Sequence, residues 1–250
     1  CTIAIDPWWR DLFAGDNWAK LLGEFPLVPE DFPSLDVILC THWHDDHLCP
    51  EALPRLAATF PKCKIVVPSR SLEICRTWGI PDAQLIGTNG HRMQSIDPLR
   101  FKAIPAAHTE LDFDEDGASW YVGYVLECDG ICIYHMGDGQ PWPGWYTAIK
   151  KAAESFKGED KETMDEKRLD VALLCINGND NLSHVQAVDF IEIVKPHTAI
   201  PMHYGMDPGN TVDSSIYVDE LVSRLPDYQC TVANVGERIQ FASDALKVMR

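Results

Sequence analysis

Short apolar runs and longer mixed segments alternate along the chain. Apolar runs bounded by Gly, Pro or polar residues predict strands, and longer segments of mixed apolar and polar residues predict helices. We predict strands over residues 2–6, 36–41, 65–67, 84–86, 99–105, 119–128, 131–136, 170–176 and 198–202, and two short strands near 230–241. We predict helices over 18–22, 50–60, 69–78, 143–168, 184–195 and 212–224, and a long loop for most of 7–34.

Local signals support several of these boundaries. Pro50 suits the first turn of a helix, Gly79 suits the end of one, and Ser183 suits an N-cap better than a catalytic nucleophile. The Asp129-Gly130 pair is typical of a tight turn between two antiparallel strands. Because strands alternate with helices and hairpin signals also occur, the sequence predicts an α/β sandwich of mixed sheets with helices outside. The 250 residues suit one domain with two halves, about 1–125 and 126–250.

Composition narrows the class of partner. Hydrophobic residues make up 46% of the chain, which is enough for a large core, and the net charge is −17. That charge argues against a nucleic-acid partner, which needs clustered Lys and Arg, but still allows a small phosphorylated substrate held by a metal. No apolar run approaches the ~20 residues that span a membrane. The nine cysteines include no Cys-x-x-Cys pair, so we expect reduced thiols and a cytoplasmic protein.

Side chains that can bind a metal ion are concentrated at residues 42–47, His42-Trp43-His44-Asp45-Asp46-His47, directly after the apolar run 37–40. Imidazole and carboxylate groups together favour zinc, manganese or similar divalent ions. His42 and His44 are two residues apart, so an extended segment would place them on the same side. Asp46 and His47 follow at the turn into the next helix and could face a second ion. The cluster predicts a metal-dependent hydrolase, because a divalent ion generates a nucleophilic hydroxide at neutral pH.

Three further candidate ligands follow apolar strands. His108 comes after the strand at 99–105, Asp138 after 131–136, and His203 after 198–202. Strands that end in this way can bring their last polar residues to one edge of the sheet. These three residues therefore extend the cluster at 42–47 into one predicted metal site.

This set of residues resembles the metallo-β-lactamase superfamily: His-x-His-x-Asp-His, a later His, a Gly-Asp and a last His, in that order. Asp6 in Ile5-Asp6-Pro7 is similar to the early strand end of that superfamily. The resemblance implies an αββα four-layer sandwich. The first pair of N-terminal strands expected before Asp6 has no counterpart, so either these strands are lost from this chain or the half-sheet is reduced.

Within the superfamily, the chain is most similar to the L-ascorbate-6-phosphate lactonase-like branch. This resemblance depends on Thr41 before the cluster and on the segments Trp78-Gly79-Ile80-Pro81, Ala106-Ala107-His108-Thr109, Tyr134-His135-Met136-Gly137-Asp138 and Ile200-Pro201-Met202-His203. It implies the ligands of one or two divalent ions, Zn²⁺ or Mn²⁺ first, with Fe or Ni as alternatives. The first ion would take His42, His44 and His108, the second would take Asp46, His47 and His203, and Asp138 would bridge them.

Two residues receive catalytic roles. Asp46 is the best candidate for orienting the attacking water and moving its proton. His184, which precedes a predicted helix near the strand at 170–176, could contact substrate or assist proton transfer. His135 is either a partner of a metal ligand or a core histidine. Trp8 follows the first predicted strand and either walls a pocket or simply packs.

The predicted reaction is hydrolysis of a lactone or ester bond in a small polar metabolite, with a phosphorylated one included. A phosphodiesterase is the enzymatic alternative, and a non-catalytic metal-binding or sensory protein is the alternative of another class. The intact set of seven ligand-type residues argues against the latter. The expected partners are a small-molecule substrate and, in a homo-oligomer, further copies of the chain, with no nucleic acid and no membrane.

Overall fold

The first sheet has four parallel strands in a computed structural model that describes residues 1–9, 21–23, 25–90, 92–156 and 169–241. Its strands, in spatial order, are β1 (Ile3–Ile5), β2 (Val37–Leu39), β3 (Lys64–Pro68) and β4 (Leu85–Thr88). The connections carry the short 3₁₀ helices η1 (Pro29–Asp31) and η2 (Ser69–Ser71) and the helices α1 (Ala52–Thr59) and α2 (Leu72–Thr77).

The second sheet is mixed and has six strands in the described part of the chain. These are β5 (Met93–Ile96), β6 (Leu99–Pro105), β7 (Val122–Cys128), β8 (Ile131–His135), β9 (Val171–Cys175) and β10 (Thr198–Met202), in the spatial order β10-β9-β8-β7-β6-β5. β5 to β8 are antiparallel neighbours, whereas β8, β9 and β10 are parallel. Helices α3 (Trp145–Glu154), α4 (His184–Val194) and α5 (Ser215–Arg224) follow β8, β9 and β10.

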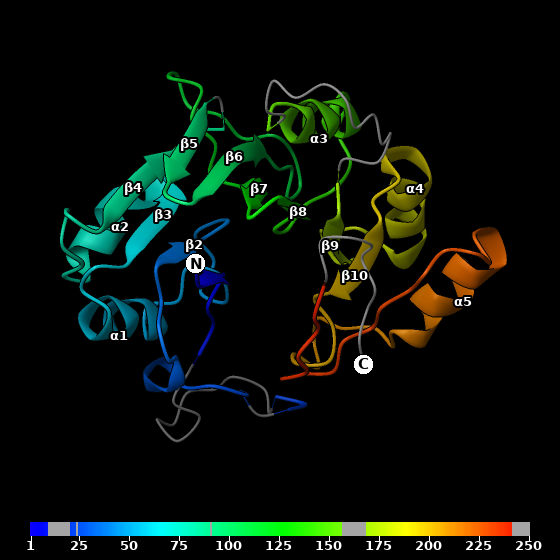
Figure 1. Ribbon diagram of the computed structural model, residues 1–250, viewed down its shortest axis with the longest axis horizontal. Helices are drawn as coiled ribbons and strands as arrows, with labels where there is room; N and C mark the ends of the chain where they lie inside the picture. The colour runs from blue at the N-terminus through cyan, green and yellow to red at the C-terminus, as the bar shows by residue number, and fades with distance from the viewer. Residues whose placement is uncertain (10–20, 24, 91, 157–168, 242–250) are drawn as a thin grey trace.

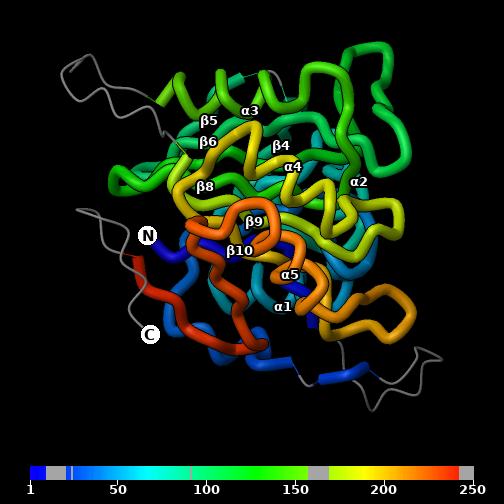
Figure 2. The backbone as a smooth tube through the Cα atoms, turned by 90° about the vertical axis from the view of Figure 1, so that its right-hand side faces the viewer, coloured from blue at the N-terminus to red at the C-terminus, as the bar shows by residue number. Residues whose placement is uncertain are grey.

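The two sheets stack between two layers of helices. α1 and α2 lie outside the first sheet (Figure 1), and α3, α4 and α5 cover the outer face of the second (Figure 2). Side chains of β2 show the reason, because Val37 and Leu39 face the second sheet whereas Ile38 and Cys40 pack toward the helices. The core between the sheets also contains Phe101 of β6. This is the αββα sandwich that the resemblance implies.

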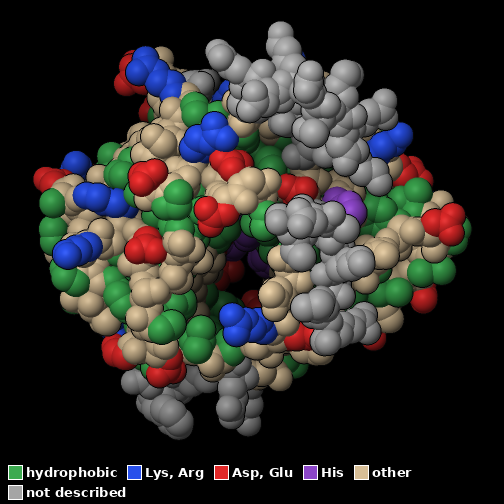
Figure 3. Space-filling view, in the orientation of Figure 1, with side chains coloured by type: hydrophobic (Ala, Val, Ile, Leu, Met, Phe, Trp, Pro, Cys, Tyr) green, Lys and Arg blue, Asp and Glu red, His purple; other side chains and the backbone are tan. Residues whose placement is uncertain are grey.

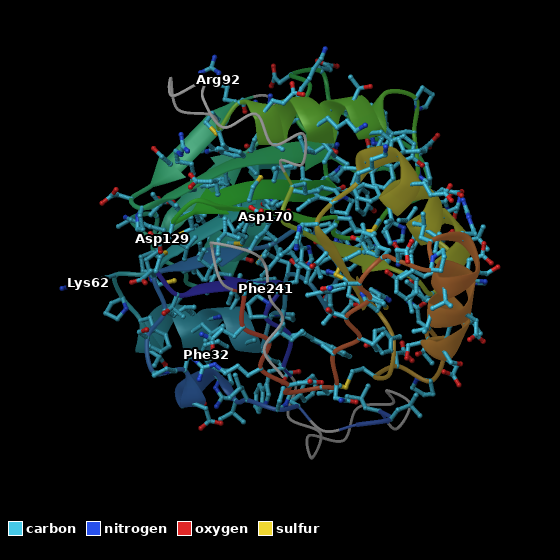
Figure 4. All side chains as sticks on the ribbon, turned by 45° about the vertical axis from the view of Figure 1, so that its right-hand side comes forward. Phe32, Lys62, Arg92, Asp129, Asp170 and Phe241 are labelled. Carbon is cyan, nitrogen blue, oxygen red and sulfur yellow. The ribbon has the colours of Figure 1, made fainter. Side chains whose placement is uncertain are left out.

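Local predictions based on turn and cap chemistry are confirmed. Asp129 and Gly130 both have positive φ, 53° and 81°, as the tight turn between β7 and β8 requires. Figure 4 labels Asp129 beside this turn, on the same side of the molecule as Lys62, which precedes β3. The Ser183 side chain accepts a hydrogen bond from the backbone N–H of Gln186 and forms a capping box with it at the start of α4.

Other predicted elements were wrong or lie outside the described residues. The two strands predicted near 230–241 are not formed within the described residues, where Cys230 makes an isolated bridge to Ala199, Gln240 is also a bridge position, and the residues between them are largely exposed. β5 was not predicted, because its side chains alternate between exposed and half-buried and include no apolar run. The predicted helix 143–168 forms as α3 up to Glu154, and residues 157–168 lie outside the described residues. Residues 18–20 of the predicted helix 18–22 also lie outside them.

The chain passes from the first sheet to the second between Thr88 and Met93. This division between the sheets is not the predicted division into halves near residue 125, which falls inside β7 and stays a prediction. None of the helices in the described ranges is both long and apolar enough to cross a membrane.

Candidate metal centre

The predicted ligands lie in the loops that follow four strands. His42, His44, Asp46 and His47 come after β2 of the first sheet, whereas His108, Asp138 and His203 come after β6, β8 and β10 of the second. The site therefore lies where the two sheets meet. Figure 3 shows histidine and acidic side chains inside a hollow on this face of the molecule.

The structure brings all seven predicted ligands together. In each of three overlapping groups, one ligand atom per residue lies within 4.8 Å of the others. The groups are His42, His44 and His108; His42, His47 and Asp138; and Asp46, His47 and His203. The first and third groups match the two ligand sets that the resemblance implies.

Asp138 stands between the two sets. Its Oδ2 atom lies 3.7 Å from Nε2 of His108 in one set and 3.3 Å from Nε2 of His203 in the other. Its Oδ1 atom lies 3.5 Å from Nε2 of His47. This placement suits a carboxylate that would bridge two ions, and the bridging role stays a prediction.

Asp6 holds the loop that carries the histidines. Its carboxylate accepts hydrogen bonds from the backbone N–H and the hydroxyl of Thr41, both at 2.7 Å, and lies 2.8 Å from Nδ1 of His47. Asp6 itself has a φ of 48°, a conformation that residues other than Gly rarely adopt. Strained backbone of this kind persists only where the surrounding contacts fix it. The role of Asp6 was not predicted, although its position at the end of a strand is the same signal that identified His108.

In two histidines Nδ1 donates a hydrogen bond, so Nε2 is available as the ligand atom. The Thr41 hydroxyl donates to Asp6, so it accepts from Nδ1 of His42, which lies 3.0 Å away. In the same way, Asp6 accepts from Nδ1 of His47. Partners of this kind set the tautomer and the orientation of metal-binding histidines.

The donor atoms present fit a divalent metal ion. Nε2 of His47 is buried and has no hydrogen-bond partner, although Asp46 Oδ2 lies 3.4 Å away. Nε2 of His42 and Nδ1 of His44 approach to 3.0 Å. Buried polar atoms normally have a hydrogen-bond partner. A buried imidazole nitrogen that has none and lies near carboxylates is typical of a metal ligand.

The charge states of His42 and Asp138 suit metal binding, whereas His47 has to release a proton when an ion binds. Burial lowers the pKa of His42 well below its ordinary value, and the neighbouring His47 lowers it further, so His42 is neutral, as a ligand must be. Burial alone would raise the pKa of Asp138, but His47 and His203 hold it well below its usual range. Burial alone would lower the pKa of His47, but the carboxylates of Asp6 and Asp138 hold it well above its usual value.

Gly137 allows the chain to reach this position. Its φ is 63°, and a Cβ atom there would lie 2.7 Å from the carbonyl oxygen of Val122 and 2.8 Å from Cβ of Thr41. These distances are shorter than real Cβ contacts. A glycine is therefore required just before Asp138.

Two other residues that the sequence did not reveal hold Asp138. The Asn181 amide donates to Oδ2 of Asp138 at 3.2 Å and accepts from the backbone N–H of Gly139 at 2.8 Å. The buried thiol of Cys175 contacts Oδ1 of Asp138 at 3.8 Å, and burial together with this carboxylate raises the pKa of the thiol. Single polar residues of this kind have no spacing signal in the sequence.

A cavity of about 260 Å³ opens onto the second ligand set. Asp46, His47 and His203 line it together with Trp8, Met202, Tyr204, Met206 and Asn210. Among the described residues, its lining includes no Lys or Arg, although Figure 3 shows a basic side chain at the margin of the hollow. Trp8 lines this cavity and also packs against a hydrophobic core cluster, so both alternatives for this residue apply.

His135 and His184, whose roles the sequence leaves open, differ in burial and in their position relative to the ligands. His135 is buried, lines this cavity and accepts a hydrogen bond from the backbone N–H of Gly137 at 3.2 Å. His184 is the first residue of α4 and is only partly buried. Within the described residues, His184 belongs to none of the three ligand groups and lines neither this cavity nor the one described below. Its catalytic role stays a prediction.

The fold and the ligand geometry define a metallo-β-lactamase type of protein. The profile of the family described as "Beta-lactamase superfamily domain" matches residues 2–204. The chain therefore belongs to the metallo-β-lactamase superfamily.

Similar proteins agree with this placement. A UPF0173 metal-dependent hydrolase of Myxococcus xanthus is 32% identical over 212 residues, which cover 82% of this chain and 64% of that protein. A UPF0173 metal-dependent hydrolase of Pyrococcus furiosus is 31% identical over 74% of this chain and 73% of its own length. These relatives do not carry a lactonase name, so the lactonase-like branch stays a prediction.

Solved structures with low sequence identity share the fold. Igni18, a metallo hydrolase of Ignicoccus hospitalis, superimposes with a TM-score of 0.68 at 23% identity, over 94% of this chain and 88% of the other. An isothiocyanate hydrolase from Delia radicum gut bacteria gives a TM-score of 0.65 at 15% identity, over 96% of this chain and 89% of the other.

Proposed function

We propose that the protein is a metal-dependent hydrolase that cleaves a lactone or ester bond in a small molecule, and that the seven converging residues hold one or two divalent ions. The observation that carries this proposal is the position of Asp138 between two sets of ligand atoms. The UPF0173 metal-dependent hydrolases support the hydrolase class by their names. Zn²⁺ and Mn²⁺ suit the mixed imidazole and carboxylate donors.

A bound divalent ion would supply an acidified water and polarise the oxygen of the scissile bond. Asp46 is placed to take the proton of that water. Burial opposes ionisation of its carboxyl group, but the neighbouring His47 lowers its pKa, so Asp46 is a carboxylate at neutral pH. Its side chain is 35% exposed and lines the cavity, where a water can reach it.

The reaction balances without a further reagent. The water oxygen forms a bond to the carbonyl carbon, and its proton passes to Asp46. The bond from that carbon to the leaving oxygen then breaks, and Asp46 returns the proton to this oxygen. The products are a carboxylic acid and an alcohol, which are joined in one molecule when the substrate is a lactone.

Activity and metal content should be measured on the same samples. We expect protein loaded with Zn²⁺ or Mn²⁺ to hydrolyse lactones or esters in a panel that also includes a phosphodiester. A chelator should abolish this activity and added metal should restore it. His44→Ala should lose bound metal and activity together, while circular dichroism reports whether it is folded. Activity of His44→Ala at normal metal content would contradict the assignment, and selective phosphodiester cleavage would replace the substrate class.

A further inference from the structure

A second cavity of about 450 Å³ shares no lining residue with the first one. We call it the aromatic pocket and define it by its lining residues, Trp43, Arg70, Ile74, Asp112, Trp120 and Tyr121. Three of these six side chains are aromatic, and none of the six belongs to the predicted ligands. Metal binding therefore does not account for the residues that line this pocket.

Tyr121 joins the aromatic pocket to the first ligand set. Its ring centroid lies 5.3 Å from that of His42, 5.8 Å from that of His44 and 5.2 Å from that of His108. Tyr121 also lines the aromatic pocket. The pocket and the first ligand set therefore lie next to one another at this residue.

Trp43 is a second residue that links the aromatic pocket to the first ligand set. It lines the pocket and lies in the chain between the ligands His42 and His44. Its ring packs against that of His44 at a centroid distance of 4.6 Å, and its indole N–H donates to the Tyr121 hydroxyl at 3.2 Å. Both contacts fix the orientation of the ring. The side chain nevertheless stays 44% exposed, and Ile74 of α2 in the same lining is 38% exposed. Adjacent exposed apolar side chains in a concave site are typical of a ligand-binding surface.

The charges of the aromatic pocket do not favour an anion. Arg70 is the basic side chain of the lining, and its guanidinium stacks on the Trp120 ring at 4.1 Å. It also pairs with Asp112 at 3.4 Å and with Asp114 at 3.8 Å. Two carboxylates thus offset one guanidinium, and an incoming phosphate would meet the carboxylate of Asp112 in the same lining.

From the aromatic lining, its contacts with the ligand histidines through Tyr121 and Trp43, and its charge, we propose that the aromatic pocket binds an uncharged aromatic group of the substrate, next to the bond that is cleaved. The proposal deepens the hydrolase function and rests on it. It replaces the phosphorylated metabolite that the resemblance implies with an ester or lactone that carries an aromatic substituent. Flat rings suit this site because they can stack on Trp43 and Tyr121.

Binding can be tested apart from turnover. The metal-loaded protein is titrated with 2-naphthol and with 2-naphthalenesulfonate, an anion of similar shape and a weak metal ligand, with tryptophan fluorescence as the readout. Ile74→Glu adds a carboxylate to the pocket, and Ile193→Glu on α4, at a side chain that is 43% exposed, is the matched control. We expect 2-naphthol to bind about tenfold more tightly than the sulfonate, and Ile74→Glu alone to weaken it about fivefold or more. Equal binding of the two probes, or no effect of Ile74→Glu, would overturn the proposal.

Turnover separates this inference from the proposed function. A phenyl-substituted and a methyl-substituted δ-lactone are compared by kcat/KM, and we expect a preference of about tenfold for the phenyl form that Ile74→Glu removes and Ile193→Glu keeps. Equal rates for both lactones together with unbound naphthol would overturn the pocket while the hydrolase stands. Tight naphthol binding that is sensitive to Ile74→Glu, without hydrolysis of any lactone or ester, would support the pocket while the hydrolase function fails.

Discussion

The carboxylate of Asp6 lies 2.8 Å from Nδ1 of His47, a residue 41 positions later in the chain. Asp6 directly follows β1 of the first sheet, and His47 belongs to two of the three ligand groups. The contact therefore links the edge of a sheet to the orientation of a ligand. Because the same carboxylate also binds Thr41, which in turn binds His42, one side chain orients two histidines.

We expect Asp6→Asn to lower metal affinity by about 10- to 100-fold, because an amide cannot replace the carboxylate in its hydrogen bonds to Thr41 and His47 at once. Affinity is measured by competition with a chromophoric chelator. Asp36→Asn is the matched control, since Asp36 is exposed and accepts one backbone hydrogen bond, from Thr2, far from the ligands. Unchanged affinity of Asp6→Asn would show that the carboxylate does not support the site.

Metal affinity should also increase with pH. In the protein without metal, Asp6 and Asp138 overcome the effect of burial and hold the pKa of His47 well above its ordinary value of 6.5. Between 6.5 and the raised pKa, folded His47 therefore keeps a proton that an unperturbed histidine would lose, and a metal ion must displace it. The pKa of His203 is raised as well, so we expect Zn²⁺ affinity to rise at least about tenfold per pH unit in this window.

Proton release gives the independent measurement for this pH dependence. Calorimetry in two buffers with different ionisation enthalpies counts the protons that leave when Zn²⁺ binds. We expect at least one proton to leave the wild type, because the pKa values of the ligands His47 and His203 are both raised, and a smaller number to leave Asp6→Asn, since Asp6 is one of the carboxylates that raise the pKa of His47. Binding that is independent of both pH and buffer would contradict the charge state argued above.

The sequence revealed the candidate ligands because they are dense and regularly placed. Three histidines and an aspartate follow one apolar strand within six residues, and each distal residue follows a strand of its own. Strand ends of this kind meet where the two sheets join, so residue type and position together predicted the cluster. The grouping around Asp138 agrees with the sets that the resemblance implied.

The supporting residues were not visible in the sequence for a physical reason. Asn181 acts by reaching Asp138 from a loop 43 positions away, and Tyr121 acts by lying against three histidine rings. Such contacts depend on tertiary packing and leave no periodic pattern. The same holds for β5, whose alternation of exposed and half-buried residues lacks an apolar run, and for Cys230, whose single bridge replaces a predicted strand.

Gly137→Ala should destabilise the protein by about 2 kcal/mol or more. The added methyl group would meet the Val122 carbonyl and the Thr41 side chain, and the φ of 63° adds strain. Gly130→Ala is the control: its φ is 81°, but nothing lies within 4 Å of the new Cβ, so it should lose only the conformational term of about 1 kcal/mol. Urea unfolding measures both. Equal losses would mean that the close approach at Gly137 is relieved at no cost.

Asn181→Ala should weaken metal binding about tenfold while the protein stays folded. The substitution removes the amide that donates to Asp138 and leaves the backbone N–H of Gly139 without its acceptor, so the bridging carboxylate is held less firmly. Asn179→Ala is the matched control, because Asn179 is exposed and its amide donates to Asn210 instead of Asp138. Chelator competition gives the affinity and thermal unfolding gives the stability of each variant. If both variants bind metal as tightly as the wild type, Asp138 is positioned by its own strand end and by the ion, and the amide of Asn181 serves only to shape the loop before α4.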